Sequence, residues 1–413
     1  MAAKNRAEVE PLPKALLPLY HRIYCFLWLW GLKLIATVHT IYKDLTHPPP
    51  PSTQPTLTLH LPSRPTLQTR IFYPPTYTPG QPTLLPTYIN LHGGGFAVNT
   101  ARFDDPFCAS WSQRTGMLVL SLDYRKIPRH PFPTAIHDVE AQIRDLLADP
   151  ALPIDPARLV IGGFSAGASL ALGVAQRPSL RGKFRAAVCY YPIVDFSHSP
   201  PEKMRARPYE DYWRDHLGDA GWWIDWGYVC AGQDRRDPLL SPWYAPAENL
   251  PDMVYMVAAE FDLLRVEAQE IIHRLAGLEG RKDKEEGFEV GGYKWTMAEG
   301  SSPGIAPKQP YEAAPPYQKY SEVAQADQDD LESQPSPSHR HGDTDPTSNI
   351  PLVTSVITTP HEHCEACERI IARREQRQNQ LQCCGMVAIV FVMLFICLTI
   401  LGAVFARAKA HDD

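Results

Sequence analysis

The chain has 413 residues, a formal net charge of −6 and 44% hydrophobic residues. A chain of that length is longer than one average domain. It leaves room for an α/β domain of roughly 200–250 residues with further segments beside it. The mildly acidic charge excludes a basic surface of the size that nucleic-acid binding needs. Its nine cysteines are odd in number, with four scattered through the first 300 residues and the others in the C-terminal part, so no disulfide framework is indicated.

Residues 1–47 form an apolar N-terminal segment, which we expect to act as a cap or a membrane-interface element. Within it, residues 24–38 are apolar and rich in tryptophan, but they are interrupted by Lys33 and short for a membrane span. We therefore expect an interfacial helix or one that covers a substrate site. A signal anchor is the alternative, and it would place the following domain in a lumenal compartment.

Residues 48–300 alternate between short apolar runs and helical segments, the pattern of a mostly parallel sheet with helices on both faces. Ligands bind such sheets at the carboxyl ends of the strands, so chemical groups at those ends are the candidates for a site. A hairpin is expected to lead the sheet. Its strands are predicted at 56–61 and 69–73, and buried strands at 87–91, 117–122, 158–161, 186–190 and 253–258.

The first candidate group is the run His92-Gly93-Gly94-Gly95-Phe96, directly after a predicted strand. Successive glycines let backbone N–H groups converge on an anion, because no Cβ atom stands in the way. The run therefore predicts half of an oxyanion hole, although a glycine run by itself also makes an ordinary turn.

The second group is Gly163-Phe164-Ser165-Ala166-Gly167, between a predicted strand and an apolar helix. A serine on a sharp strand-to-helix turn needs small neighbours, because its backbone packs tightly while its hydroxyl projects outward. This context predicts Ser165 as a nucleophile.

The third group is Asp262, just past the strand predicted at 253–258. A carboxylate there could orient an imidazole, and the chain order of serine before aspartate suits this fold. An acidic residue at a helix start is more often a simple N-cap, so the structural interpretation also stands.

Together these motifs resemble the α/β-hydrolase-3 family, which includes hormone-sensitive lipase, arylacetamide deacetylase and fungal esterases. The resemblance covers about residues 85–270 and also includes Asp123-Tyr124-Arg125, YYPIVDF and DPLLSPWYAP. It implies that Ser165 attacks an acyl carbon, that the N–H groups of Gly94, Gly95 and Ala166 hold the oxyanion, and that Asp262 supports a histidine. The family usually has an aspartate where this chain has Phe164.

The histidine that the family pattern requires is missing from its expected place. It should follow a final strand, but the matching stretch at 288–300 contains none. His273 follows Asp262 too closely and is expected to lie on a helix surface. Without a positioned base, Ser165 should lose most of its nucleophilic advantage.

Three readings follow for residues 48–300: an esterase with an unrecognised base, a ligand-binding relative such as the plant gibberellin receptors, or a hydrolase domain joined artificially to another protein. We favour the join, because the resemblance stops where the histidine is due. The predicted function of the domain is hydrolysis of lipophilic acyl esters through an acyl-serine, and that chemistry needs no metal or organic cofactor.

The C-terminal part changes character. Residues 301–384 have the composition of a disordered linker, 385–406 form an uncharged run long enough to span a membrane, and 407–413 are a short tail. The span predicts a single-pass membrane protein with its hydrolase domain in the cytosol. Cys383 and Cys384 are candidate S-acylation sites. The cluster His361-Glu362-His363-Cys364-Glu365-Ala366-Cys367 has zinc-ligand residue types but no second spaced pair, so no metal site is predicted.

Overall fold

The computed structural model describes residues 18–78, 80–206, 216–280 and 287–298, and the side chains of 216–220 are not described. All of these residues belong to the first of two compact units, Met1–Ala324. The linker predicted at 301–384, the span predicted at 385–406 and the tail at 407–413 lie outside the described residues.

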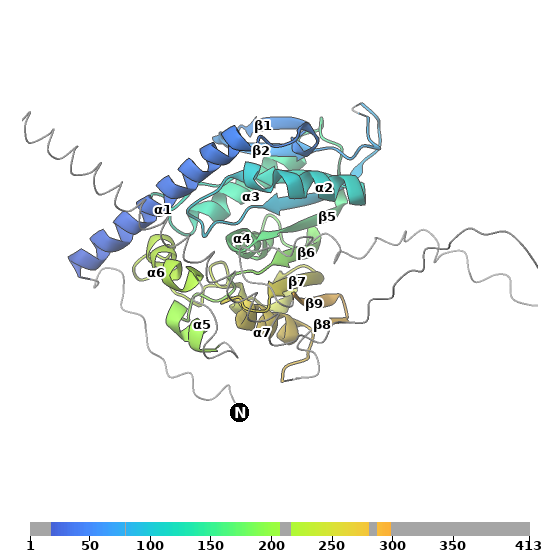
Figure 1. Ribbon diagram of the computed structural model, residues 1–413. Helices are drawn as coiled ribbons and strands as arrows, with labels where there is room; N and C mark the ends of the chain where they lie inside the picture. Colours follow the sequence, from blue (N-terminus) through green and yellow to red (C-terminus); the bar gives the residue numbers. More distant parts are fainter. Residues whose placement is uncertain (1–17, 79, 207–215, 281–286, 299–413) are drawn as a thin grey trace, which may run out of the picture. The chain divides into compact units, whose positions relative to one another are not determined.

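Nine strands in the described part of the chain form one sheet in the order β1-β2-β4-β3-β5-β6-β7-β9-β8 (Figure 1). The pairs within the central run from β4 to β9 are all parallel, whereas β1, β2 and β8 pair antiparallel with their neighbours. The strands are β1 (Leu57–Leu61), β2 (Arg64–Phe72), β3 (Leu85–Leu91), β4 (Leu118–Leu122), β5 (Ile154–Phe164), β6 (Phe184–Tyr190), β7 (Met253–Ala259), β8 (Gly287–Val290) and β9 (Tyr293–Ala298).

The leading hairpin and the five predicted buried strands are confirmed, with shifted ends. The largest difference is in β5, which begins at Ile154 and not at residue 158. The start of β5 shows no apolar run, because Asp155 is half-buried and Pro156, Ala157 and Arg158 are exposed, but Ile154 pairs with Leu85 of β3. Strands β8 and β9 were not predicted, because Gly287 and Glu289 interrupt the apolar pattern of the first.

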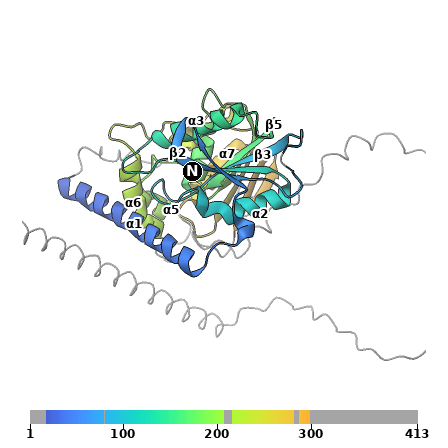
Figure 2. The ribbon, with the colours of Figure 1, turned by 90° about the horizontal axis from the view of Figure 1, so that it is seen from above.

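Helices cover both faces of the sheet, as expected (Figure 2). One face packs against α2, whose Phe107 and Cys108 lie in a cluster with Tyr88 and Val119. The other face packs against α3, α4 and α7. The helices are α1 (Leu19–Thr46), α2 (Asp105–Thr115), α3 (Thr134–Ala148), α4 (Ala166–Ala175), α5 (Pro200–Ala206), α6 (His216–Tyr228) and α7 (Arg265–Leu275), with short 3₁₀ turns η3 (Pro51–Thr53), η4 (Ala101–Asp104), η5 (Pro242–Tyr244) and η6 (Ala247–Asn249).

The N-terminal helix is longer than the sequence pattern indicated. The apolar stretch was predicted at 24–38 and too short to span a membrane, but α1 has 28 residues. By length and composition it is the one helix in the described ranges that could cross a bilayer. Lys33 does not interrupt it, because its ammonium lies 5.4 Å from the centre of the Trp30 ring on the flank of the helix.

Candidate active site

Ser165 occupies the sharp turn between β5 and α4. Its backbone has φ 50° and ψ −118°, a conformation that costs free energy for a residue with a side chain. Neighbouring backbone holds the turn in place: the Ser165 N–H donates to Tyr190 O at 2.8 Å, and Ser165 O accepts from the Ser169 N–H at 3.1 Å. The predicted strand, strained serine and helix are therefore present, with the N-terminus of α4 directly after Ser165.

The end of β3 packs directly against this turn. A Cβ atom added to Gly167 would lie 2.0 Å from Leu91 O and 2.6 Å from His92 O, and one added to Gly163 would lie 2.0 Å from Leu91 O. Contacts this short are impossible, so both glycines are required for the close approach of the two segments. The approach brings the glycine loop after β3 next to Ser165.

The glycine loop turns back on itself immediately after His92. Gly94 has φ 115°, and its carbonyl accepts the N–H groups of Ala97 and Val98, each at 3.0 Å. Gly95 has φ 57° and lies against Ile224 of α6, whose Cδ1 would be 2.5 Å from a Cβ added there. The loop is therefore fixed from within and covered by α6. That its N–H groups and that of Ala166 bind an oxyanion stays a prediction.

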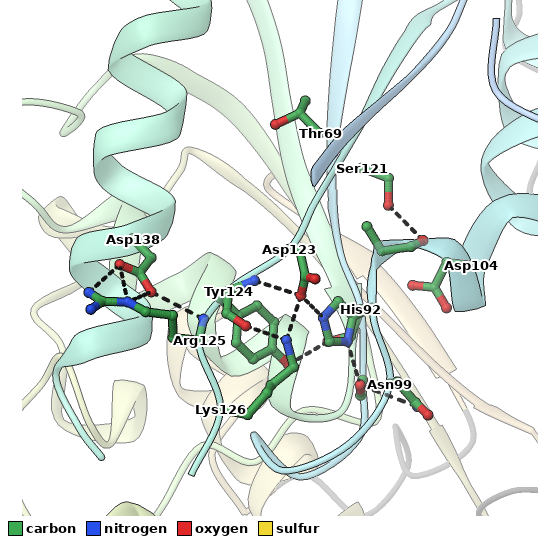
Figure 3. A network of polar contacts seen from close by, with 12 residues as sticks. Thr69, His92, Asn99, Asp104, Ser121, Asp123, Tyr124, Arg125, Lys126 and Asp138 are labelled. Carbon is green, nitrogen blue, oxygen red and sulfur yellow. Dashed lines mark hydrogen bonds and ion pairs between the residues drawn. The ribbon is translucent and has the colours of Figure 1, made fainter. Parts of the chain in front are cut away.

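His92 anchors the start of this loop (Figure 3). Its ring is completely buried and stacks on Tyr124, with ring centres 4.4 Å apart, and the Tyr124 hydroxyl donates to His92 O at 2.9 Å. Nδ1 lies 2.7 Å from Gly93 O and Nε2 lies 3.1 Å from Asp123 Oδ1. Burial lowers the pKa of His92, and the Lys126 ammonium acts in the same direction. Each ring nitrogen of His92 thus faces an oxygen atom, one in the loop and one in Asp123, and a neutral imidazole donates to one of the two.

Asp123 is the centre of the polar network around His92. Burial alone raises the pKa of Asp123, but the hydrogen bonds from His92 and Lys126 lower it to about 2. Lys126 Nζ lies 2.5 Å from Asp123 Oδ1, and the Tyr124 N–H donates to the same oxygen at 2.8 Å. In the triplet Asp123-Tyr124-Arg125, which carried part of the family resemblance, Asp123 and Tyr124 therefore support the loop, whereas Arg125 pairs with Asp138 of α3 at 2.7 Å.

Asp262 is fully buried just past β7. Its Oδ1 accepts the N–H of Leu264 at 2.9 Å, and Leu264 is the N-cap of α7. Asp262 is therefore not the N-cap itself, although it does orient the chain before α7. Strand β6 separates β5 from β7, so the two strands that precede Ser165 and Asp262 lie two strand spacings, about 10 Å, apart. That an imidazole fits between the two side chains stays a prediction.

The position where the family places its histidine follows β9. The carbonyl of Ala298, the last residue of β9, accepts the N–H of Glu260 at 3.0 Å, so this strand ends beside the segment that holds Asp262. The residues that come next lie outside the described part of the chain. His273 was expected on a helix surface, and that is wrong: it is buried, with its ring 5.1 Å from that of Phe288 and nearly perpendicular to it.

Phe164, which stands where the family usually has an aspartate, belongs to an aromatic cluster. Its ring stacks on Tyr190 at 4.7 Å and meets Phe107 of α2 edge-on at 4.8 Å. Such pairs stabilise by about 0.5–1.5 kcal/mol each beyond the area they bury. The side chain next to the nucleophile is therefore part of the α2-facing core.

Asp104 is a buried acid close to the site that the sequence pattern did not reveal. It lies in η4 after the glycine loop, and its Oδ2 accepts from Asn90 Nδ2 at 2.9 Å. Burial raises its pKa to about 7, while the Asn90 hydrogen bond lowers it less. The folded protein thus keeps a proton on Asp104 at pH values where the unfolded chain has lost it.

This difference predicts how Asp104→Asn changes stability. A raised carboxyl pKa makes the folded state lose stability as pH rises from about 4 to about 7. The variant cannot ionise, so its unfolding free energy should match the parent at pH 4 and exceed it by a few kcal/mol at pH 8, at about 1.4 kcal/mol per pKa unit. Urea unfolding at both pH values measures this. If the unfolding free energies of the variant and the parent differ by the same amount at the two pH values, Asp104 does not titrate in this range.

A strained serine after a central parallel strand, next to a glycine loop after the neighbouring strand, defines an α/β hydrolase. Residues 88–286 match a family model described as alpha/beta hydrolase fold, so this part of the chain is similar to the α/β-hydrolase-3 family.

Similar proteins come from bacteria and animals. The chain is 32% identical over 205 residues to an ethyl acetate hydrolase of Pseudomonas putida, covering 48% of this chain and 62% of that protein. It is 32% identical over 137 residues to neutral cholesterol ester hydrolase 1 of Pongo abelii, covering 31% of this chain and 33% of that protein. It thus spans less than two thirds of either relative.

A solved structure of an ester hydrolase from the metagenome of Lake Arreo, in complex with a bipyridine phosphonate derivative, superposes with a TM-score of 0.50 at 27% identity. The match covers 64% of this chain and 78% of that one.

Proposed function

We propose that the domain is a serine hydrolase of lipophilic carboxylic esters, with Ser165 as the nucleophile. The observation that carries this proposal is the backbone of Ser165, held at positive φ between β5 and α4 and packed against the glycine loop. The turn does not need a serine for its structure, and its strained backbone costs free energy. Such a turn is the arrangement that presents a serine hydroxyl to an acyl carbon.

The proposed reaction passes through an acyl-serine. Ser165 Oγ attacks the carbonyl carbon, and the negative oxygen forms beside the N–H groups of Gly94, Gly95 and Ala166 at the N-terminus of α4. The leaving alkoxide takes a proton from the base, water then cleaves the acyl-serine, and Ser165 regains its proton. Asp262 would orient the imidazole that moves these protons.

The relatives' names support esters as the substrate class. One is named for ethyl acetate and another for cholesterol esters, so the acyl and alcohol groups differ widely within the family. The run at 385–406 is proposed to anchor the chain to a membrane, with residues 48–300 as the hydrolase domain on the cytosolic side.

A second function is favoured by one specific feature of the sequence. Residues 288–300, where the family pattern places the base, contain no histidine. A domain that keeps the fold and the glycine loop but has no base would bind acyl ligands without cleaving them.

Labelling by a fluorophosphonate tests the first function against the second. The probe should attach to Ser165, slowly if no base is present, because the oxyanion site still favours attack. Peptide mapping by mass spectrometry identifies the labelled residue, and Ser165→Ala should abolish the label. A folded chain that resists the probe and turns over no p-nitrophenyl ester would support the binding function.

A further inference from the structure

The N-terminal helix α1 presents an uninterrupted apolar face away from the protein. Six large aliphatic residues on this face, Ile23, Leu27, Leu34, Val38, Ile41 and Leu45, are between 42% and 80% exposed. They follow one another at steps of four, seven, four, three and four residues, which places them on one side of a helix with 3.6 residues per turn. We call them the outer face.

The opposite side of α1 contacts the hydrolase body. Cys25 and Leu29 are buried, and Leu32 and Ala36, at the next helical steps, are half-buried. Trp28 stacks on Trp223 of α6 with ring centres 4.9 Å apart and planes 5° apart. Near the other end, Arg102 of η4 lies 2.9 Å from Asp44. Figures 1 and 2 both show α1 running beside α6.

This arrangement inverts the usual amphipathic pattern. A surface helix in water turns its apolar side to the core and its polar side to solvent. The charged residues of α1 are Arg22, Lys33, Lys43 and Asp44, and none lies on the outer face. The outer face therefore suits contact with an apolar medium, and from Ile23 to Leu45 it extends for about 33 Å at 1.5 Å per residue.

The chemistry of α1 favours a lipid surface as that medium. Tyrosine and tryptophan border the outer face, and these residues prefer the membrane interface. Three of the four charged residues of α1 are basic, and the single acid is paired with Arg102, so the charge complements anionic lipid headgroups. Two further exposed rings, Phe103 and Trp222, are the chain neighbours of Arg102 and Trp223, which contact α1.

Packing against α6 excludes a spanning orientation for the helix in this structure. Trp28 and Leu29 are the tenth and eleventh of its 28 residues and pack against α6, so any span of about 20 residues within α1 would carry α6 into the hydrocarbon. Helix α6 would carry Asp225 into the hydrocarbon with it. The Asp225 carboxylate accepts two hydrogen bonds from Arg235, at 2.6 and 2.7 Å. Charged groups and irregular backbone are strongly disfavoured in lipid.

We propose that α1 lies in the plane of an anionic membrane surface, with its outer face in the lipid and the glycine loop of the hydrolase close behind it. Ile224, two residues past the exposed Trp222, touches Gly95. A single helix, α6, thus contacts α1 through Trp223 and the loop proposed as the oxyanion hole through Ile224. If the domain is the proposed esterase, its ester substrates would enter the site from the bilayer. This part of the inference rests on the proposed function.

Depth-dependent quenching tests the orientation. A genetically encoded fluorescent amino acid replaces Leu27, Leu34 or Ile41 in the full chain, reconstituted in vesicles of phosphatidylcholine and phosphatidylserine. Lipids brominated near the headgroup should quench all three positions alike, and more strongly than lipids brominated deep in the acyl chain, because an in-plane helix sits about 5–10 Å into the boundary. The matched control is Met253, exposed at the start of β7, which should not be quenched.

Other outcomes would overturn the proposal. Strongest deep quenching at position 34, with shallow quenching at 27 and 41, would indicate a spanning helix. Absence of quenching at all three positions would place the face in water or against a second copy of the chain. Quenching that is unchanged without phosphatidylserine would contradict the role of anionic lipid. Ser165→Ala should leave the quenching intact, so loss of turnover alone bears only on the proposed function.

Discussion

A chain whose residues from 301 onward are replaced by a family-type ending, with a His-small-aromatic triplet and a closing helix, is expected to hydrolyse short acyl esters at least about 10³-fold faster than the chain as printed. The imidazole accepts the Ser165 proton and returns it to the leaving alkoxide. Strand β9 ends beside the segment that carries Asp262, so a histidine placed after β9 lies within reach of its carboxylate. The measurement is kcat/KM for p-nitrophenyl acetate.

The half-buried face of β7 supports the closing helix in this design. Val254, Met256 and Ala258 are fully buried on the face that α7 covers, whereas Tyr255 and Val257 on the α2 face are only partly buried. A helix across the α2 face would remove these two side chains from water. That burial favours folding of the extended chain by about 25 cal/mol per Å² of apolar surface.

Asp262→Asn is the control that separates catalysis from folding. In the extended chain it should lower kcat by up to about 10⁴-fold, because the histidine loses the partner that fixes its tautomer. In the chain as printed it should change turnover little. If the printed chain already turns over esters at about 1–10³ s⁻¹, an unrecognised base is present and the join hypothesis is wrong. Transcripts read across Gly300 and Ser301 test the same hypothesis independently.

Gly167→Ala is expected to unfold the domain or to destabilise it by several kcal/mol. The new Cβ would lie 2.0 Å from Leu91 O and 2.6 Å from His92 O, and both are backbone atoms of the adjoining strand and loop. Overpacking of a rigid site usually costs about 1–3 kcal/mol and sometimes more, whereas the gain in helix propensity is only about 1 kcal/mol. Thermal and urea unfolding of both proteins measure the difference.

Gly31→Ala makes the same substitution in α1, where a Cβ would meet no atom within 4 Å. Only the helix propensity changes there, so this control should be unaffected or stabilised by up to about 1 kcal/mol. Equal stability of the two variants would mean that β3 does not approach the serine turn as closely as described.

The positions of the buried strands along the chain and the serine turn were predictable because their signals are local. Apolar runs mark the buried strands, and Gly163 and Gly167 flank Ser165 at a spacing that only a tight turn explains. The burial of His273 was not predictable, because it depends on Phe288 of a hairpin whose own sequence signal is weak. The raised pKa of Asp104 likewise depends on the surroundings that distant segments create.

The outer face of α1 was missed for a different reason. Lys33 within the apolar stretch was taken as an interruption, yet at 100° per residue it falls on the flank, with Arg22 and Asp44. Reading the same residues by helical angle separates the charges from the six aliphatic residues. The helical period of the six aliphatic residues could therefore be recognised in the sequence. The packing of α1 against α6 could be known only from the structure.

The pairing of α1 with α6 also sets an order of events during synthesis. About 170 residues separate the two helices in the chain, so at roughly 5–20 residues per second α1 leaves the ribosome some ten to thirty seconds before its partner exists. Throughout that interval both sides of α1, the face that will meet α6 and the outer face, are uncovered. A chaperone or a membrane must shield the nascent helix during this time, and translation stalled before α6 would leave an aggregation-prone product.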